Sequence, residues 1–440
     1  MEIQTIGGYE EVGKNMTAVK VGDEIIIMDM GIHLDNYIKY TEDEDIVGIR
    51  ASELVKVGAI PDIKDLEVNK VKAIVLTHAH LDHLGAVPFL SNKFNAPIIC
   101  TPYTGAVLRA IIEDNKMHLK NEIKAIAPNS TYKISKNIKI ELVNTTHSVP
   151  QTVMITLHTK DGILVYANDF KFDLHPVMGQ KPNFKRLKEL GKKGVKILIM
   201  DSIYSQREQK TPSESVAKQM LKDVLFGIRD EEKGIIITTF SSHLTRLKSI
   251  IEFGKLLDRK VVLLGRSLAK YVYAGEDIGL IKFSDKADIV KYSRKIKKKL
   301  REIQKDGKEK YIIVVTGHQG EPKAVLSKMI NKEYDFHFSH DDSVIFSCTI
   351  IPSEVNTMNR EKLEDNLKSH GVRIFKDIHV SGHASREDHR DLINMLKPKH
   401  IIPAHVEHDR AESMAELCEQ IGYKTKETVH IMKNGQKLVI

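Results

Sequence analysis

The pattern of apolar and polar positions divides the chain into segments of different character. Residues 1–35 alternate and turn as in a β-meander, with Gly7-Gly8 and Gly13 as turn residues. One helix is predicted over 104–120, where apolar residues recur at helical spacing. Short apolar runs predict further strands at 73–76, 96–100, 138–143, 152–159 and 163–167.

After about residue 175 the pattern changes to strands that alternate with helices. The predicted strands of this series are 195–200, 234–239, 260–264, 311–316 and 344–351. Repetition of strand, loop and helix predicts a parallel, doubly wound sheet, which binds ligands at the carboxyl ends of its strands. Histidine-rich segments return after residue 372, so we predict a first domain at 1–180 and its completion at 369–440, with an inserted α/β domain at 181–368.

A group of polar residues interrupts the apolar segment Val71–Pro88. His78, His80, Asp82 and His83 follow the predicted strand directly and precede apolar residues that suit a short helix. Imidazole nitrogens and carboxylate oxygens are the ligands that Zn²⁺ takes in hydrolytic sites. The alternative, a chance surface cluster, does not explain why such restrictive spacing occurs inside apolar sequence.

Three further ligand candidates occupy similar positions, at strand ends or between strands. They are His147, Asp169 and His405. Each alone would more simply be a core or capping residue, but together with the first cluster they make seven ligands, enough for two zinc ions. Asp169 is the natural bridge, because a carboxylate has two oxygens to share. Two such ions suit an in-line phosphoryl displacement.

Composition and charge restrict the class of protein further. The 440-residue chain is long enough for two or three domains, and it has no apolar span that would cross a membrane. Three widely spaced cysteines indicate a reducing compartment, and the N-terminus has neither the pattern of a signal peptide nor that of a transit sequence. The net charge of +8 favours a polyanionic partner. The most basic stretch, 291–301, suits either a solvated helix face or an RNA contact.

The order of these motifs resembles a known family. An HxHxDH cluster followed by a lone His, a lone Asp and a distant His is similar to the metallo-β-lactamase superfamily. The interrupted first domain resembles the β-CASP nucleases of that superfamily and, within them, ribonuclease J of the archaeal type. The matching segments span nearly the whole chain: GGYEEVGKNMT, THAHLDHLGAVP, TFSSHLTRL, GRS, TGHQGEP, HVSGHAS and KPKHIIPAHVEH. The implied fold is an αββα sandwich interrupted by an α/β domain with a parallel sheet.

The resemblance implies two Zn²⁺ per chain and a role for each matching residue. His78, His80 and His147 would hold one ion. Asp82, His83 and His405 would hold the other, with Asp169 between them.

Around the ions, Asp29 would steady the metal-binding loop, and Asp201 would hydrogen-bond a histidine of the site. His383 would contact the scissile phosphate or protonate the leaving oxygen, so the implied catalytic residues are His383, Asp201 and Asp169. The residues that would cradle phosphate groups are Ser241, Ser242, His379, Val380, Ser381, Gly382, His383, Ala384 and Ser385.

The expected activity is therefore a two-zinc 5′→3′ exoribonuclease on single-stranded RNA, with a preference for a 5′-monophosphate, in RNA processing and decay. The resemblance leaves open an endoribonuclease related to the polyadenylation factor, and an RNA-binding scaffold without turnover. A small-molecule hydrolase would leave the insertion and the basic charge unexplained. We expect a cytoplasmic protein without membrane contact. A homodimer is compatible with the sequence. Bacterial relatives usually continue with a further domain, whose oligomer contacts are not expected here because this chain stops at Ile440.

Overall fold

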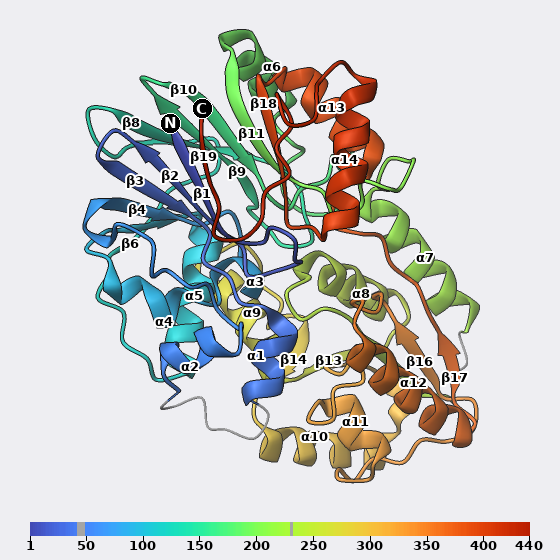
Figure 1. Ribbon diagram of the computed structural model, residues 1–440. Helices are drawn as coiled ribbons and strands as arrows, with labels where there is room; N and C mark the ends of the chain where they lie inside the picture. The colour runs from blue at the N-terminus through green and yellow to red at the C-terminus, as the bar shows by residue number, and fades with distance from the viewer. Residues whose placement is uncertain (42–48, 229–231) are drawn as a thin grey trace. The chain divides into compact units, whose positions relative to one another are not determined.

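The computed structural model describes residues 1–41, 49–228 and 232–440, and the chain forms two compact units (Figure 1). The first unit combines Met1–Pro212 with Ser381–Ile440, and the second is Ser213–Val380. The domain boundaries expected from the sequence, 180 and 368, stay a prediction. Across the described residues, no helix combines the length and the apolar character needed to cross a membrane.

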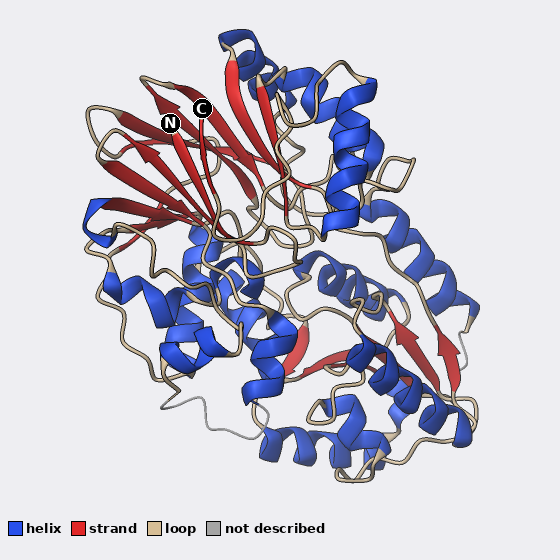
Figure 2. Cartoon of the chain, viewed as in Figure 1, coloured by secondary structure: helices blue, strands red, loops and turns tan. Residues whose placement is uncertain are grey.

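Two mixed sheets form the centre of the first unit (Figure 2). One has the strand order β19-β1-β2-β3-β4-β5-β6, and the other β18-β11-β10-β9-β8-β7. The strands of the first sheet are β1 (Glu2–Gly7), β2 (Met16–Val21), β3 (Glu24–Met28), β4 (Val71–Val75), β5 (Ile98–Cys100), β6 (Ile123–Ala125) and β19 (Lys437–Val439). Those of the second are β7 (Thr131–Lys133), β8 (Ile138–Asn144), β9 (Val153–Thr159), β10 (Gly162–Ala167), β11 (Val195–Asp201) and β18 (His400–Ala404).

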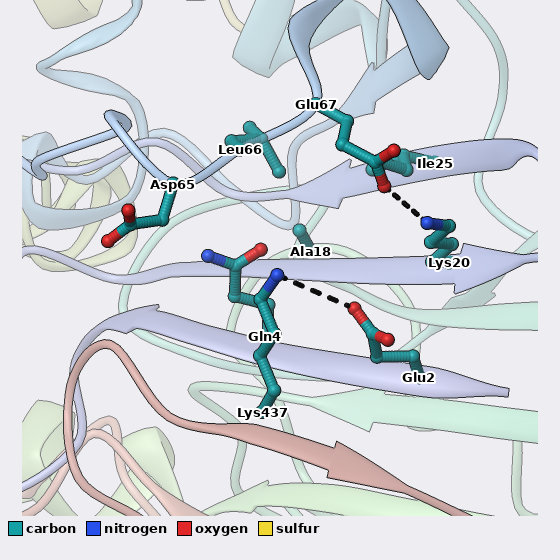
Figure 3. Close-up of a pocket in the computed structure, with 9 residues that line it drawn as sticks. All are labelled: Glu2, Gln4, Ala18, Lys20, Ile25, Asp65, Leu66, Glu67 and Lys437. Atoms are coloured by element: carbon teal, nitrogen blue, oxygen red, sulfur yellow. Dashed lines mark hydrogen bonds and ion pairs between the residues drawn. The ribbon is translucent and has the colours of Figure 1, made fainter.

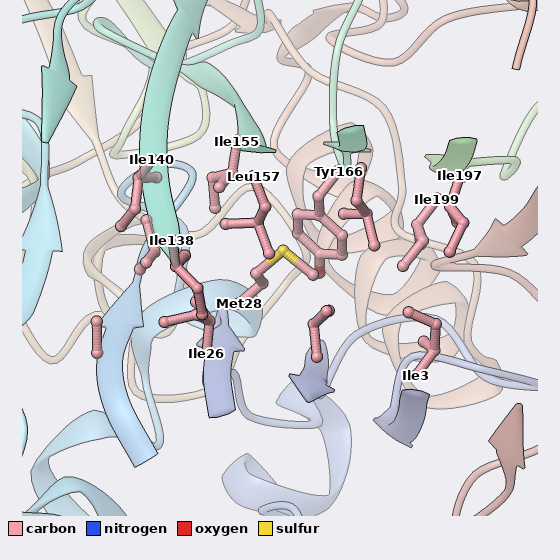
Figure 4. Packing of buried hydrophobic residues seen from close by; sticks show 14 of the residues in the cluster. Ile3, Ile26, Met28, Ile138, Ile140, Ile155, Leu157, Tyr166, Ile197 and Ile199 are labelled. Atoms are coloured by element: carbon pink, nitrogen blue, oxygen red, sulfur yellow. The ribbon is translucent and has the colours of Figure 1, made fainter. Parts of the chain in front are cut away.

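The inner faces of these two sheets share one apolar core (Figure 4). Ile26 and Met28 of β3 pack in the same cluster as Leu157 of β9 and Tyr166 of β10, and all four are buried. Alternate residues of each strand point to this core, because side chains along a strand alternate between the two faces. Burial of this continuous apolar surface is the main force that holds the two sheets together.

Helices cover the outer faces and complete an αββα arrangement, which agrees with the fold expected from the sequence. The second sheet packs with α6 (Phe184–Lys193), α13 (Arg386–Leu396) and α14 (His408–Gln420), whose apolar residues join a separate cluster with β9, β10 and β11. The helices between the strands of the first sheet are α1 (Leu34–Thr41), α2 (Ala51–Lys56), α3 (Leu81–Leu84), α4 (Val87–Leu90) and α5 (Pro102–Asp114).

A single parallel sheet with the order β14-β13-β15-β12-β16-β17 forms the second unit. Its strands are β12 (Ile235–Thr238), β13 (Lys260–Leu264), β14 (Ala287–Val290), β15 (Tyr311–Val315), β16 (Ser343–Phe346) and β17 (Arg373–Phe375). Its helices are α7 (Glu214–Gly227), α8 (Leu244–Leu256), α9 (Arg266–Asp277), α10 (Ser293–Asp306), α11 (Val325–Ile330) and α12 (Glu354–Ser369). The central strands β13, β15, β12 and β16 are mostly apolar and almost entirely buried, as expected for a parallel sheet with both faces covered.

Several elements differ from the sequence pattern. The strand at 195–201 was grouped with the strand–helix series, but β11 pairs in parallel with β10 and β18 and so belongs to the first unit. Strand β16 ends at Phe346 rather than at 351, because the Ser347 carbonyl oxygen accepts hydrogen bonds from the Thr239 hydroxyl and the Arg246 guanidinium instead of extending the ladder. Helix α5 ends at Asp114 rather than at 120, and Lys116 two residues later has a left-handed backbone with φ 52°.

Candidate metal centre

The first four ligand candidates lie where strand β4 passes into helix α3. His78 and His80 lie in the turn, His80 is the N-cap of α3, and Asp82 and His83 lie in its single turn. The turn packs against the end of β3 so closely that a Cβ on Gly31 would lie 1.6 Å from the Asp82 carbonyl oxygen. Backbone bonds from Met30 to His83 (2.7 Å) and from Asn15 to Asp82 (3.0 Å) hold this contact.

One group of side chains converges from three segments. His78, His80, His147 and Asp169 offer ligand atoms that all lie within 4.8 Å of one another. His80 Nδ1 lies 3.0 Å from His78 Nε2 and 3.1 Å from His147 Nε2. The Asp169 carboxylate lies 3.5 Å from His78 Nε2 and 3.4 Å from His147 Nε2.

A second group uses the same aspartate. Asp82, His83, Asp169 and His405 also place their ligand atoms within 4.8 Å of one another. Asp169 Oδ2 lies 3.3 Å from His83 Nε2, and Asp169 Oδ1 lies 3.8 Å from His405 Nε2. Asp169 therefore stands between the two groups, and each of its oxygens faces a histidine.

Backbone strain marks three residues of this centre. Asp29, Asp169 and His405 have φ values of 58°, 57° and 54°, in the left-handed region that non-glycine residues seldom adopt. Each lies one or two residues after the end of a strand, β3, β10 or β18. Strain of this kind persists where the surrounding structure imposes it, commonly at functional sites.

Neighbouring groups orient the candidate ligands through their remaining nitrogens. Asp29 lies 2.8 Å from His83 Nδ1 and accepts hydrogen bonds from the backbone N–H (2.8 Å) and hydroxyl (2.9 Å) of Thr77. His147 Nδ1 lies 2.7 Å from the Gly382 carbonyl oxygen, and His405 Nδ1 lies 2.8 Å from the Asn15 amide. Partners of this type set the tautomer and ring orientation of metal-binding histidines.

The electrostatics of the centre suit a metal ion. Burial lowers the pKa of His78 to about 3 and that of His80 to about 4, and it lowers the pKa of His147 well below its usual value. Burial raises the pKa of Asp169, but the nearby His83 and His405 outweigh it and hold that pKa well below the usual range. Three neutral imidazoles and a carboxylate thus face one point. Asp169 Oδ1 is buried without a hydrogen-bond partner in the described part of the chain. These residues fit a divalent metal.

His383 and Asp201 form a further pair at the same centre. Asp201, at the end of β11, lies 2.8 Å from His383 Nδ1, and His383 Nε2 lies 3.9 Å from Asp169 Oδ2. Burial alone would lower the pKa of His383, but the Asp169 and Asp201 carboxylates raise it to about 10. Asp201 holds the imidazole with its other nitrogen toward the candidate metal ligands.

The residues expected to cradle phosphate differ in how far their polar groups are available. Ser381 Oγ accepts the backbone N–H of His383 at 3.0 Å. Ser385 is buried and its hydroxyl lies 2.9 Å from that of Thr211, while Ala384 is fully buried. These three therefore shape the loop around His383, and the side chains of Ala384 and Ser385 are already enclosed by protein.

The other four phosphate-site candidates belong to the second unit. Ser241 and Ser242 both precede helix α8, which begins at Leu244 with His243 as its N-cap. The Ser241 hydroxyl lies 2.9 Å from that of Ser267, so the loop after β12 contacts the first turn of α9. The His379 ring lies 5.8 Å from that of Phe240, and Val380 is buried.

Sequence reasoning named Asp29 as a supporting residue but missed other groups that support the ligands. Asn15, Thr77 and Gly31 were not singled out, although Asn15 lies in the matching segment GGYEEVGKNMT.

A small pocket beside β1 and β2 is lined by Lys20, Glu67, Glu2 and Lys437, which form ion pairs (Figure 3). Its volume of about 10 Å³ holds at most one water molecule, so it is no substrate site.

Comparison with known proteins identifies the family. Residues 10–189 match the metallo-beta-lactamase superfamily, residues 232–363 match the beta-CASP domain of ribonuclease J, and residues 371–432 match a Zn-dependent metallo-hydrolase RNA specificity domain. The chain is 46% identical to ribonuclease J of Methanocaldococcus jannaschii, with 100% of this chain and 98% of the relative covered. The chain belongs to the ribonuclease J family.

Two further relatives and a solved structure agree with this assignment. Identity to ribonuclease J of Pyrococcus abyssi is 43%, over 100% of this chain and 97% of the relative. Ribonuclease J 1 of Streptococcus pyogenes is 33% identical, over 99% of this chain and 73% of the relative. A crystal structure of a protein of unknown function from Enterococcus faecalis shares the fold, with a TM-score of 0.67 at 16% identity over 100% of this chain and 99% of that chain. The chain is thus a metal-dependent ribonuclease, as expected from its sequence.

Proposed function

We propose that this ribonuclease J holds two zinc ions and removes nucleotides from the 5′ end of single-stranded RNA, with a preference for a 5′-monophosphate. The observation that carries the metal count is the presence of two four-residue ligand groups that share Asp169. One ion would lie among His78, His80 and His147, and the other among Asp82, His83 and His405. The 5′→3′ direction is supported by the family to which the chain belongs.

The ligand residues would be held in place by the chain before any metal binds. Asp29 fixes the ring of His83, Gly382 fixes that of His147 and Asn15 fixes that of His405. Bound zinc would lower the pKa of a water molecule and stabilise charge on the phosphate oxygens. Because the rings are already oriented, the free energy of zinc binding need not be spent on ordering them.

His383 would act on the RNA itself. Its Nδ1 lies 2.8 Å from an Asp201 oxygen, and its Nε2 is directed to the same side as the ligand groups. It can therefore donate a hydrogen bond to a phosphate oxygen or transfer its proton to the departing 3′ oxygen. Asp201 would hold the ring in this orientation. We also propose a cytoplasmic location, because all three cysteines are buried free thiols.

The test compares three RNAs of one sequence that differ only at the 5′ end: monophosphate, hydroxyl and triphosphate. Each carries a label at its first nucleotide, and products are separated by length at low conversion. We expect labelled mononucleotide as the first product, fastest from the monophosphate. A ladder of longer labelled fragments would instead indicate an endoribonuclease. Equal rates from all three RNAs would remove the proposed 5′-monophosphate preference.

A further inference from the structure

Helix α10 has an apolar side and a strongly basic side. Ile296, Leu300 and Ile303 are buried, and they belong to the apolar cluster that includes Val262 and Ile313 of the parallel sheet. These three residues anchor the helix to its own unit, so the remaining surface of α10 needs another explanation for its composition.

The surface opposite the buried stripe carries a row of cations. Arg294, Lys298, Arg301 and Lys305 follow the i, i+4, i+7, i+11 spacing of one helix face. All four are exposed, with 79% of the Lys298 side chain and 62% of the Arg301 side chain accessible. At 1.5 Å per residue the row is roughly 16 Å long, a length that spans several phosphates of a single strand.

Acidic residues compensate this charge only in part. Lys299 pairs with Asp288 at 2.6 Å, and Arg301 pairs with Asp335 at 2.9 Å. Within the described ranges, no ion pair is formed by four cations of the helix, which are Arg294, Lys295, Lys297 and Lys305.

The position of the cations opposes helix stability. Arg294 and Lys295 lie in the first turn, which has no acidic residue, although the positive end of the helix dipole favours carboxylates there. Intrinsic helix stability therefore does not account for this charge. A polyanion at the surface would relieve the repulsion between these side chains and the helix end.

Exposed aromatic rings adjoin the cations. Tyr292, the N-cap of α10, is 58% exposed, and Tyr273 on α9 is 38% exposed. The Lys291 ammonium lies 5.6 Å from the centre of the Tyr292 ring. Burial and the Glu276 carboxylate raise the pKa of Tyr273, whereas Lys291 lowers it and Tyr292 raises it, so all three groups lie near this ring. Bases of a single strand stack on such rings, while cations beside the rings bind the phosphates.

We propose that Tyr292, together with the exposed cations of α10, forms an accessory binding surface for single-stranded RNA. This proposal rests on the proposed function, since the RNA is the substrate of the same enzyme. The residues of this surface are distinct from the candidate metal ligands. Charge complementarity and the two tyrosine rings favour a single strand over an acidic protein, which would gain nothing from stacked bases.

The first experiment removes four charges from α10 with the variant R294Q/K295Q/K297Q/K298Q. A matched control, K185Q/K188Q/K192Q/K193Q, removes the same charge from the exposed lysines of α6. Both are placed in a His383→Ala chain so that RNA is not consumed. Binding of a 30-nucleotide unstructured RNA is then measured between 50 and 300 mM salt.

We expect the α10 variant to bind at least about tenfold more weakly at low salt. Its slope of log affinity against log salt should fall by up to about 2.8, at about 0.7 per lost phosphate contact. The α6 control should change affinity by less than about threefold. Equal losses in both variants, or an unchanged affinity and slope in the α10 variant, would overturn the proposal.

The second experiment tests stacking with Tyr292→Ala and Tyr292→Phe. The alanine variant should bind RNA about fivefold or more weakly, and phenylalanine should restore the affinity because it keeps the ring. Loss in both variants, or in neither, would refute a stacking role. A five-nucleotide RNA should be hydrolysed at the wild-type rate by chains that carry these α10 and Tyr292 changes and retain His383. Failure of the unaltered chain to hydrolyse this RNA would refute the proposed function rather than the accessory surface.

Discussion

Replacement of Gly382 by alanine should disturb the candidate metal centre through one histidine. Gly382 lies in the loop that precedes α13, and its carbonyl oxygen lies 2.7 Å from His147 Nδ1. A Cβ at this position would lie 2.8 Å from both Nδ1 and Cε1 of the same ring. The new methyl group would therefore press on the edge of the His147 ring that contacts the Gly382 carbonyl oxygen, and the ring would have to move.

The size of the movement follows from the distances. Ordinary contact begins at about 3.4 Å, so the ring must shift by at least the difference from 2.8 Å, which is about 0.6 Å. Metal–ligand distances tolerate only about 0.2 Å. Loss of a supporting partner typically costs 10–100-fold in metal affinity, and overpacking costs about 1–3 kcal/mol. The two ranges agree, because tenfold corresponds to about 1.4 kcal/mol.

The assay measures zinc per chain by elemental analysis after dialysis against a weak chelator, together with the rate of RNA hydrolysis. Gly382→Ala should lose zinc from the site that contains His147 at a 10–100-fold lower chelator concentration than the wild type. Activity should fall in parallel. Gly227→Ala at the end of α7 is the control, since a Cβ there meets no atom within 4 Å. Wild-type zinc retention and activity in Gly382→Ala would refute the reasoning.

Three further predictions follow from the geometry of the same centre. Gly31→Ala should lower the yield of folded, zinc-loaded protein severely, because the new Cβ would lie 1.6 Å from the Asp82 carbonyl oxygen; thermal unfolding and zinc content would measure this, and a wild-type melting temperature would contradict it. His80→Ala and His383→Ala should both reduce RNA hydrolysis by at least about 100-fold, but only His80→Ala should lose zinc; zinc loss in both would remove His383 from its separate role. Asp201→Asn should lower the pKa of His383, because one of the two carboxylates that raise it becomes neutral. The proton is then lost at lower pH, so the alkaline limb of the rate should move to lower pH, and an unmoved limb would exclude this coupling.

Four of the seven candidate ligands could be recognised from their short, local spacing, whereas the division of all seven into two groups came from the family resemblance. His78, His80, Asp82 and His83 lie in one turn, and the structure brings them together with His147, Asp169 and His405 as the spacing and the family resemblance indicate. The role of each ligand stays a prediction. The αββα sandwich with its parallel-sheet insertion was also foreseen, since strand periodicity and the βα repetition are local features.

Contacts between distant segments could not be predicted from the pattern. Asn15 reaches His405 across 390 residues, and Gly382 meets His147 across 235 residues. Strand β11 has the same apolar pattern as the strands of the insertion, but partner choice places it beside β10 and β18. Periodicity reports which face of an element is buried; it does not report against which neighbour.

The central claim is that two zinc ions held around Asp169 support RNA hydrolysis from the 5′ end. The most direct measurement removes metal from the full chain, returns zinc in steps, and records zinc per chain together with release of the first nucleotide from 5′-labelled monophosphate RNA. We expect release to begin only with zinc and to reach its maximum at two ions per chain. Full activity in the metal-free chain, or a maximum at a single ion, would contradict it.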